Sequence, residues 1–307
     1  MKKTMIRIAL AAAALAGGMC RANWREDMWT RPVTLREGVS VRARALEAPR
    51  LMKAYIARVD LSTPGIGFTA TDRAENWGEP MPDYTRRRVL IDTKRETTAA
   101  FMARRRAQGL DVELAVNTAP WGPWDCSAAY RSTYGSFGGW NVSGGVELSH
   151  GKNPERGAFI VVRKDGRVDA TSRVPVAETN SVAIAMCGFG MIMTNGVPTF
   201  SAAHPRPAQL APRTALGVTA DRKTLVVLVV DGRQPGYSLG ADIEDLYNIL
   251  RKEGVTDAVN MDGGGSSSLV VYDRAAGRPL MINRQPRGTE RKNALNFGIF
   301  FAPDLQK

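Results

Sequence analysis

The stretch Asp257-Ala258-Val259-Asn260-Met261-Asp262-Gly263-Gly264-Gly265-Ser266-Ser267-Ser268-Leu269-Val270-Val271 carries an acidic residue and a loop of glycines and serines between two apolar runs. Valine and leucine suit the pleated, buried surface of a sheet, whereas glycine permits backbone conformations that other residues avoid. The pattern predicts a strand, a tight polar loop at the end of a sheet, and a second strand. Such a loop can present bare N–H groups to an anion such as phosphate, with the carboxylate of Asp262 at the same place. A hairpin whose glycines and serines only turn the chain is the alternative that these residues leave open.

The chain that leads to this loop shows two further strands and a helix. Residues 213–219 and 224–230 are predicted to pair, and the second run is apolar throughout, as in a central strand covered on both faces. Asp242 is predicted to cap a helix that ends at Gly254 and has apolar residues at helical spacing on its inward face. Because this helix joins two apolar strands, it indicates one parallel crossover.

The remaining apolar runs are short and closely spaced. Residues 181–193 are predicted to form a buried strand or a short helix, and residues 132–153 a long loop with a short hairpin at Gly144-Gly145. Further strands are predicted at 54–60, 67–71, 112–116, 158–162, 167–170 and 293–301, and a helix at 97–108. The predicted fold class is α+β: a single domain with a large mixed, mainly antiparallel sheet, a few helices and one βαβ-like crossover near 224–262.

Residues 1–22 have the three regions of a secretory signal peptide: a basic start, a short apolar segment and a small-x-small ending. Cleavage is expected after Ala22. A lipid-modified Cys20 is the less favoured alternative, because Met19 stands where that signal requires a small residue. No later run reaches the roughly 20 apolar residues of a membrane span. We therefore expect a periplasmic or secreted protein with an N-terminal arm at 23–53 and one domain at 54–307.

Loss of the signal peptide removes Lys2, Lys3, Arg7 and Arg21 and lowers the formal net charge from +12 to +8. A basic exported protein meets anionic envelope glycans more often than nucleic acid. The triple-arginine runs at 86–88 and 104–106 lack interleaved aromatic residues, so they are interpreted as solvated faces and no nucleic-acid partner is expected.

The two cysteines outside the signal peptide, Cys126 and Cys187, can pair in an oxidising compartment, but their separation in sequence leaves the pairing open. The only histidines are His150 and His204, and Cys-x-x-Cys spacing is absent. A metal site built on the cysteines is therefore not predicted.

Several apolar strands end at, or are bordered by, polar residues, and neighbouring strand ends form a natural cleft at one edge of a sheet. These residues are Asn117, Asp231, Asp262, Arg213, Arg233 and Asn293. Carboxylates, guanidinium groups and loop amides together suit an anionic substrate whose ester or glycosidic bond is cleaved with acid–base help. Taken singly, Asp231-Gly232 also fits a turn, and Arg213 a surface cation. Trp121 suits stacking on a sugar ring, although packing over the base of a loop is the commoner use of tryptophan.

Together, these motifs resemble the phosphodiester glycosidase family, which includes the enzyme that uncovers mannose 6-phosphate by removing N-acetylglucosamine. The similarity runs through Arg213-Thr214-Ala215-Leu216-Gly217, Val230-Asp231-Gly232-Arg233, residues 260–267 and Asn293-Ala294-Leu295, and it covers most of the chain from about Ala54. Upstream, the family has Asn-Gly-Gly followed by an aromatic residue. This chain instead has Asn117-Thr118-Ala119-Pro120-Trp121, a stiffer loop that bears on the identity of the substrate.

The resemblance implies an exported hydrolase that cuts the sugar–oxygen bond of a sugar-1-phosphate diester in an envelope or extracellular glycan, such as an exopolysaccharide. The implied acid/base pair, or pair of sugar-holding carboxylates, is Asp262 and Asp231. Arg213 and Arg233 are the implied phosphate clamps. The remaining implied contacts to substrate are loop donors at Gly263, Gly264, Gly265, Ser266 and Ser267, hydroxyl-orienting amides at Asn117 and Asn293, and a sugar contact at Trp121.

Two alternatives from other functional classes stay open. A non-catalytic envelope glycan-binding protein would hold a polymer through Trp121, Trp124 and the arginines, and a glycosidase without a phosphate requirement would not need the arginines. Asp231, Asp262 and loop carbonyls offer oxygen ligands that suit Ca²⁺. The sequence contains no recognisable calcium loop, however, so no cofactor is predicted. The sugar, its anomer, the separate roles of the two carboxylates and the oligomeric state are left open.

Overall fold

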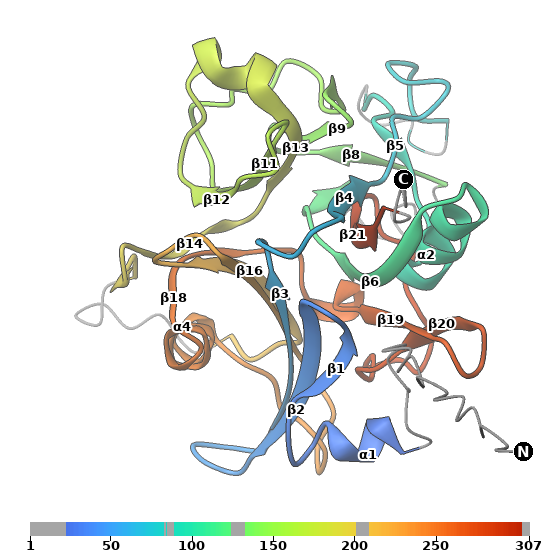
Figure 1. Cartoon of the computed structure of the whole chain (residues 1–307). Helices are drawn as coiled ribbons and strands as arrows, with labels where there is room; N and C mark the ends of the chain where they lie inside the picture. Colours follow the sequence, from blue (N-terminus) through green and yellow to red (C-terminus); the bar gives the residue numbers. More distant parts are fainter. Residues whose placement is uncertain (1–22, 83, 85–88, 124–132, 201–208, 303–307) are drawn as a thin grey trace, which may run out of the picture.

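The computed structural model describes residues 23–82, 84, 89–123, 133–200 and 209–302. In this part of the chain antiparallel strands dominate, and the helices are few and short (Figure 1). The largest sheet has the strand order β1-β2-β3-β17-β16-β18-β14-β15. Its strands are β1 Val33–Arg36, β2 Val39–Leu46, β3 Met52–Asp60, β14 Gly190–Thr194, β15 Val197–Pro198, β16 Arg213–Thr219, β17 Thr224–Val230 and β18 Val255–Asn260.

The predicted crossover lies in the middle of this sheet. β16 pairs antiparallel with β17 on one side and with β18 on the other, so β17 and β18 run parallel to each other. They are joined by α4 (Ile243–Lys252), which begins with a capping box between Asp242 and Asp245. Alternate residues of β17 belong to different hydrophobic cores, with Val227 in one and Leu228, under α4, in the other. The α+β prediction with a central crossover is confirmed.

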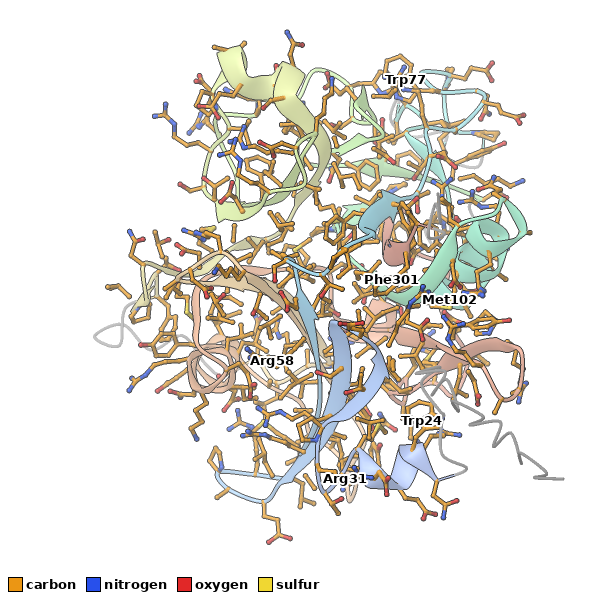
Figure 2. All side chains as sticks on the ribbon, viewed as in Figure 1. Trp24, Arg31, Arg58, Trp77, Met102 and Phe301 are labelled. Carbon is orange, nitrogen blue, oxygen red and sulfur yellow. The ribbon has the colours of Figure 1, made fainter. Side chains whose placement is uncertain are left out.

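A second sheet, in the order β20-β19-β6-β21-β4, receives the chain after the glycine-rich loop. Its strands are β4 Ile66–Ala70, β6 Asp111–Asn117, β19 Leu269–Asp273, β20 Arg278–Met281 and β21 Asn296–Phe301. Helix α2 (Thr98–Ala107) begins where the Thr97 hydroxyl accepts the Ala100 N–H at 3.1 Å. Phe101 and Met102 of this helix, the latter labelled in Figure 2, pack into a small core with β6 and β19.

The glycine-rich loop connects these two sheets. β18, before the loop, pairs with β14 and β16, whereas β19, after it, pairs with β6 and β20. The hairpin alternative is therefore wrong: the loop, which contains the short 3₁₀ helix η2 (Gly264–Ser266), passes from one sheet to the other. Sequence patterns do not distinguish the two cases, because each flanking run is apolar and strand-like whichever sheet it joins.

Two smaller sheets complete the strands, in the orders β10-β9-β13-β11-β12 and β5-β8-β7. Their bounds are β5 Thr93–Lys94, β7 Trp121–Gly122, β8 Tyr134–Phe137, β9 Val142–Ser143, β10 Val146–Glu147, β11 Phe159–Arg163, β12 Val168–Thr171 and β13 Val182–Cys187, with a 3₁₀ helix η1 at Val176–Ser181. The hairpin at Gly144-Gly145 is confirmed by the pairing of β9 with β10. Residues 181–193 form parts of two strands, β13 and β14, in different sheets. Cys187 is buried, whereas Cys126 lies outside the described residues, so their pairing stays a prediction.

The segment before residue 53 contributes to the largest sheet. After helix α1 (Trp24–Asp27), whose Trp24 is buried and labelled in Figure 2, β2 pairs with β3 from Val39↔Val59 to Leu46↔Met52. The division of the chain at residue 53 stays a prediction. The proposed signal peptide lies outside the described residues. Within the described ranges, no helix combines the length and apolar character needed to span a membrane.

The arginine run at 104–106 does not form a solvated face. It makes ion pairs with Glu96, Asp72 and Asp111, and Arg105 is buried with its guanidinium at the Ala70 carbonyl. The interpretation was wrong for this run because acidic side chains from other segments lie opposite α2. Arginines 86–88 lie outside the described residues.

Candidate functional site

A cleft of about 770 Å³ opens where the glycine-rich loop meets the start of β16 and the turn after β17. This volume lies within the range typical of small-molecule sites, about 300–1,000 Å³. Its lining residues are Phe189, Gln209, Leu210, Ala211, Arg213, Arg233, Asp262, Gly263, Gly264 and Arg291. Three guanidinium groups and one carboxyl therefore share the cleft, a combination that suits an anionic ligand.

Two glycines of the loop are required by the chain that packs against them. A Cβ atom on Gly263 would lie 2.7 Å from the Pro212 carbonyl oxygen, and Gly264 has φ +63° and lies against the guanidinium of Arg233. The N–H of Gly264 donates to Pro212 O at 2.8 Å, and that of Gly263 donates to the Asp262 carboxylate at 2.9 Å. These two N–H groups thus make internal hydrogen bonds, and the cationic side chains are left as the main donors for a phosphate.

The backbone of Asp262 is fixed from two sides. Its N–H donates to Thr118 O at 2.7 Å, and its carbonyl oxygen accepts the Asn117 side-chain amide at 2.7 Å. Both partners come from the end of β6 and the residue after it, in the second sheet. The acid therefore has a defined position relative to both sheets.

Asp262 is 95% buried, and its two carboxyl oxygens differ in their surroundings. Oδ1 accepts the Gly263 N–H at 2.9 Å, whereas Oδ2 is enclosed and makes no hydrogen bond of good geometry in the described part of the chain. The Ser266 hydroxyl and the Trp121 ring N–H lie close enough to the carboxyl group to lower its pKa. Burial raises the pKa of Asp262 to about 6, and the Ser266 hydroxyl and the Arg291 charge oppose the rise. A carboxyl group that titrates near 6 can exchange protons with a ligand close to neutral pH.

Two cations from neighbouring segments lie side by side in the cleft. Arg213 begins β16 and donates to Ala241 O at 3.1 Å and to Gln209 O at 2.7 Å, while Arg233 lies in the turn after β17 with φ +58°. The ion pairs of the described residues include neither guanidinium. Burial lowers the pKa of Arg213, and the charge of Arg233 lowers it further. A half-buried cation, Arg213, beside an exposed one, Arg233, favours an anion between them, because neither belongs to an ion pair of the described residues.

Arg291 is a third cation of the cleft, and the sequence motifs did not identify it. Its guanidinium packs on the loop, where a Cβ atom on Gly265 would lie 2.5 Å from a terminal nitrogen, and it lies 3.5 Å from the Ser266 hydroxyl. Its charge lowers the pKa of Asp262. The one available signal was its place two residues before Asn293, but Arg287 and Lys292 occupy the same basic segment.

Asp231 lies outside the lining of the cleft. Its carboxylate accepts hydrogen bonds from the Asn283 side-chain amide and the Arg284 N–H, each at 3.0 Å, and from the Tyr237 hydroxyl at 3.3 Å. The side chain is fully buried, and burial raises its pKa to about 6. The structure thus places Asp231 as a tie between the turn after β17 and residues 283–284, apart from the carboxyl group of Asp262 in the cleft.

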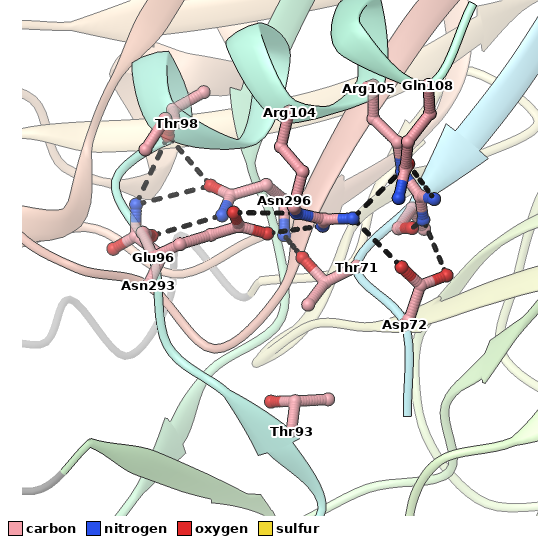
Figure 3. Close-up of polar contacts among 12 residues, drawn as sticks. Thr71, Asp72, Thr93, Glu96, Thr98, Arg104, Arg105, Gln108, Asn293 and Asn296 are labelled. Atoms are coloured by element: carbon pink, nitrogen blue, oxygen red, sulfur yellow. Dashed lines mark hydrogen bonds and ion pairs between the residues drawn. The ribbon is translucent and has the colours of Figure 1, made fainter. Parts of the chain in front are cut away.

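The two predicted asparagines are also buried framework residues. Asn117 Oδ1 accepts the Thr214 hydroxyl and the Ser268 N–H, each at 2.9 Å, and so joins β6, β16 and the glycine-rich loop. Asn293 lies beneath α2, with its amide nitrogen 3.3 Å from the Thr98 hydroxyl (Figure 3). Neither lines the cleft. The structure brings them to the back of the loop and not to its open face.

Trp121, Ser266 and Ser267 are buried residues that support the glycine-rich loop. Trp121 is 2% exposed and has the Arg95 guanidinium 4.3 Å from its ring centroid, so it matches the packing alternative and offers no open stacking surface. Ser266 and Ser267 are fully buried or nearly so. Trp124 lies outside the described residues.

The possibility of Ca²⁺ at Asp231, Asp262 and loop carbonyls stays a prediction. The described residues contain no group of three or more histidine, cysteine or acidic side chains placed to hold an ion. Ca²⁺ takes about six to eight oxygen ligands, and Asp231 and Asp262 occupy separate environments. We therefore assign no chemical step to a metal.

Solved structures with low sequence identity share this fold. A hypothetical protein from Synechocystis aligns with TM-score 0.56 and 12% identity over 89% of this chain, which spans 64% of that protein's length. The zebrafish N-acetylglucosamine-1-phosphodiester alpha-N-acetylglucosaminidase catalytic domain, auto-inhibited by its pro-peptide, aligns with TM-score 0.56 and 14% identity, covering 89% of this chain and 87% of its own. A putative exported protein from Burkholderia pseudomallei aligns with TM-score 0.53 and 16% identity, and the alignment covers 81% of this chain and 74% of that protein's chain.

None of the curated proteins matches the sequence. A family model described as phosphodiester glycosidase matches residues 127–301, which is more than half of the chain. The match contains β16, β17, the glycine-rich loop and Arg291, the elements that build the cleft. The motifs and the fold thus agree, and the chain belongs to the phosphodiester glycosidase family, a family of hydrolases.

Proposed function

We propose that this protein is exported and hydrolyses the bond between the anomeric carbon and the bridging oxygen of a sugar-1-phosphate diester in an envelope or extracellular glycan. The products are a free sugar end and a phosphomonoester. The observation that carries the proposal is the meeting, in one cleft, of the Asp262 carboxyl group and three guanidinium groups.

The cations account for the phosphate part of the substrate. Arg213 and Arg233 lack an ion-pair partner among the described residues, and Arg291 lies on the loop beside them. A phosphodiester carries one negative charge, and the departing phosphomonoester acquires a second. Interactions that strengthen as this charge develops accelerate the reaction, so the three arginines stabilise the leaving group.

With the arginines assigned to the leaving group, Asp262 is assigned to the attacking group. Because the arginines stabilise the phosphate oxygen as it leaves, the main remaining demand is to activate the attacking group. We propose that ionised Asp262 accepts a proton from a water molecule whose oxygen bonds to the anomeric carbon, while the electron pair of the broken bond goes to the phosphate. Direct attack by the carboxylate also requires the ionised form. Asp231, whose oxygens are occupied, is proposed to position the turn that carries Arg233.

Three substrates test the proposal: a sugar-1-phosphate diester, the matching glycoside without phosphate, and a phosphodiester without a sugar. Purified protein is incubated with each, and the free sugar and phosphomonoester are quantified. We expect turnover of the first compound alone. Equal turnover of the phosphate-free glycoside would identify a plain glycosidase, and saturable binding without turnover of all three would identify a glycan-binding protein. Wild-type protein with a chelator is the control for a metal requirement.

A further inference from the structure

Phe189 is an exposed aromatic residue at the cleft, and the hydrophobic clusters formed by the described residues do not include it. It is 63% exposed, in the turn between β13 and β14, and it lines the same cleft as Arg213 and Asp262. Of the large apolar side chains that are exposed in the described ranges, such as Val176 and Val197, it is the one that lines the cleft. A phenylalanine in water at the mouth of a charged cleft indicates a binding surface, since exposed apolar groups beside polar ones mark ligand sites.

The backbone of Phe189 is fixed to the strand that carries the acid. Its N–H donates to Asn260 O at 2.8 Å, two residues before Asp262. A Cβ atom on Gly188 would lie 2.4 Å from Val259 Cγ1 and 2.5 Å from Asn260 O, so this turn packs directly on β18. The backbone of Phe189 therefore holds the start of the side chain at a fixed position relative to the Asp262 carboxyl group. A firm backbone with an exposed ring suits contact with a ligand.

The cleft divides into charged and apolar parts. The three arginines and Asp262 meet the charged and reacting parts of the proposed substrate, and the apolar lining consists of Phe189, Leu210 and Ala211. A pyranose presents C–H groups on a ring face, and the electron-rich face of an aromatic ring attracts such partially positive groups. Acyclic alcohols do not offer a ring face of this kind.

We propose that Phe189 is a specificity-determining residue that forms a platform for the C–H face of the pyranose ring whose anomeric bond is broken. This inference rests on the proposed function, which already limits the substrate to sugar-1-phosphate diesters, and it adds the residue that orients the pyranose ring. The arginines hold the phosphate, and the phenyl ring sets the orientation of the sugar toward Asp262.

Binding measurements test the platform separately from catalysis. Calorimetry compares an aldopyranose 1-phosphate with inorganic phosphate on wild type, Phe189→Ala, Phe189→Tyr and the matched control Val197→Ala, which removes exposed apolar surface away from the cleft. We expect Phe189→Ala to weaken binding of the sugar phosphate about tenfold and to leave inorganic phosphate within about twofold. Phe189→Tyr retains the ring and should keep at least a third of the affinity, and Val197→Ala should match wild type.

Kinetics on a pyranosyl phosphodiester give the second readout. Phe189→Ala should raise KM about tenfold with a smaller change in kcat. An unchanged affinity for the sugar phosphate, an equal loss for both ligands, or wild-type affinity no greater for the sugar phosphate than for phosphate would overturn the platform. If the platform binds sugar phosphate as expected but no phosphodiester is hydrolysed, the proposed function fails while the binding assignment stands.

Discussion

Two strand ends in the central sheet carry buried acids that differ in their surroundings. Asp231 follows β17 and Asp262 follows β18 after one residue, and these strands run parallel on either side of β16. Burial raises the pKa of each to about 6. Asp231, however, accepts hydrogen bonds on both oxygens outside the cleft. Asp262 lines the cleft, and within the described ranges its Oδ2 makes no hydrogen bond of good geometry.

Burial and a raised pKa therefore do not by themselves distinguish the acid that lines the cleft from the acid that does not. A structural carboxyl group in a low-dielectric interior experiences the same desolvation as a functional one. The hydrogen-bond partners and the access to a cleft separate the two acids here. Substitutions that treat the acids in parallel therefore test the assignment.

The largest expected effect is on turnover. Asp262→Asn should lower kcat on a sugar-1-phosphate diester by about 10²–10⁴-fold, because it removes the proposed proton acceptor. Asp231→Asn should change kcat of the folded protein by less than about tenfold, because that carboxylate contacts structural donors. Active-site-normalised initial rates measure both. A larger loss in Asp231→Asn than in Asp262→Asn, with both proteins folded by circular dichroism, would reverse the assignment.

The two acids should contribute in the same way to the pH dependence of the free energy of unfolding. Each has a folded pKa of about 6 and an ordinary value of 3.8, so between these values the folded state binds more protons and stability falls as pH rises. The loss is largest above pH 6 and amounts to about 3 kcal/mol for each acid. Asp262→Asn and Asp231→Asn should each gain free energy of unfolding, relative to wild type, as pH rises from 4 to 7. Urea denaturation across this range measures it, and a flat difference would contradict the raised pKa.

Asn283 links the two regions, because its side-chain amide donates to Asp231 at 3.0 Å and to Ser267 O at 3.1 Å, and its oxygen accepts the Leu269 N–H at 2.7 Å. Asn283→Ala leaves these buried groups without their partner and should lower the free energy of unfolding by about 2–4 kcal/mol. Ser62→Ala, at an exposed turn, is the control and should change it by under about 1 kcal/mol. Equal stability of the two variants would show that the link is unimportant.

The smallest effect concerns the pH profile of activity. The dependence on ionised Asp262 predicts that kcat/KM of wild type rises with pH through about 6. Arg291 lowers the pKa of Asp262, so Arg291→Ala should move this limb to higher pH by up to about one unit, along with a weaker KM. The exposed Arg278→Ala is the matched control and should leave the limb in place. Activity that instead falls as pH rises through 6 would make Asp262 a general acid.

The sequence predicted most of the local structure but not how its parts meet. Alternating and apolar runs identified β3, β6, β16, β17 and β18, and the Asp242 cap located α4, because these signals are contained within short segments. The routing of the glycine-rich loop between two sheets depends on strand partners distant in sequence, which no local pattern encodes. The hairpin alternative failed for that reason.

The residues of the site were likewise predicted in part. Asp262, Arg213 and Arg233 were predicted and lie together in the cleft. Asn117 and Trp121, also predicted, prove to be buried supports, since residue type alone does not say which side of a loop a side chain occupies. Arg291 and Phe189 were missed because each is a single residue in an irregular segment, where neither periodicity nor spacing indicates contact with a cleft.

The passage of the glycine-rich loop from one sheet to the other places Asp262, the proposed reacting acid, at the connection between the two sheets. Asp262 is hydrogen-bonded to Asn117, the last residue of β6, and to Thr118 after it, and it is separated from β18 by Met261 alone. A change in the angle between the two sheets would therefore strain the hydrogen bonds that join Asp262 to Asn117 and Thr118.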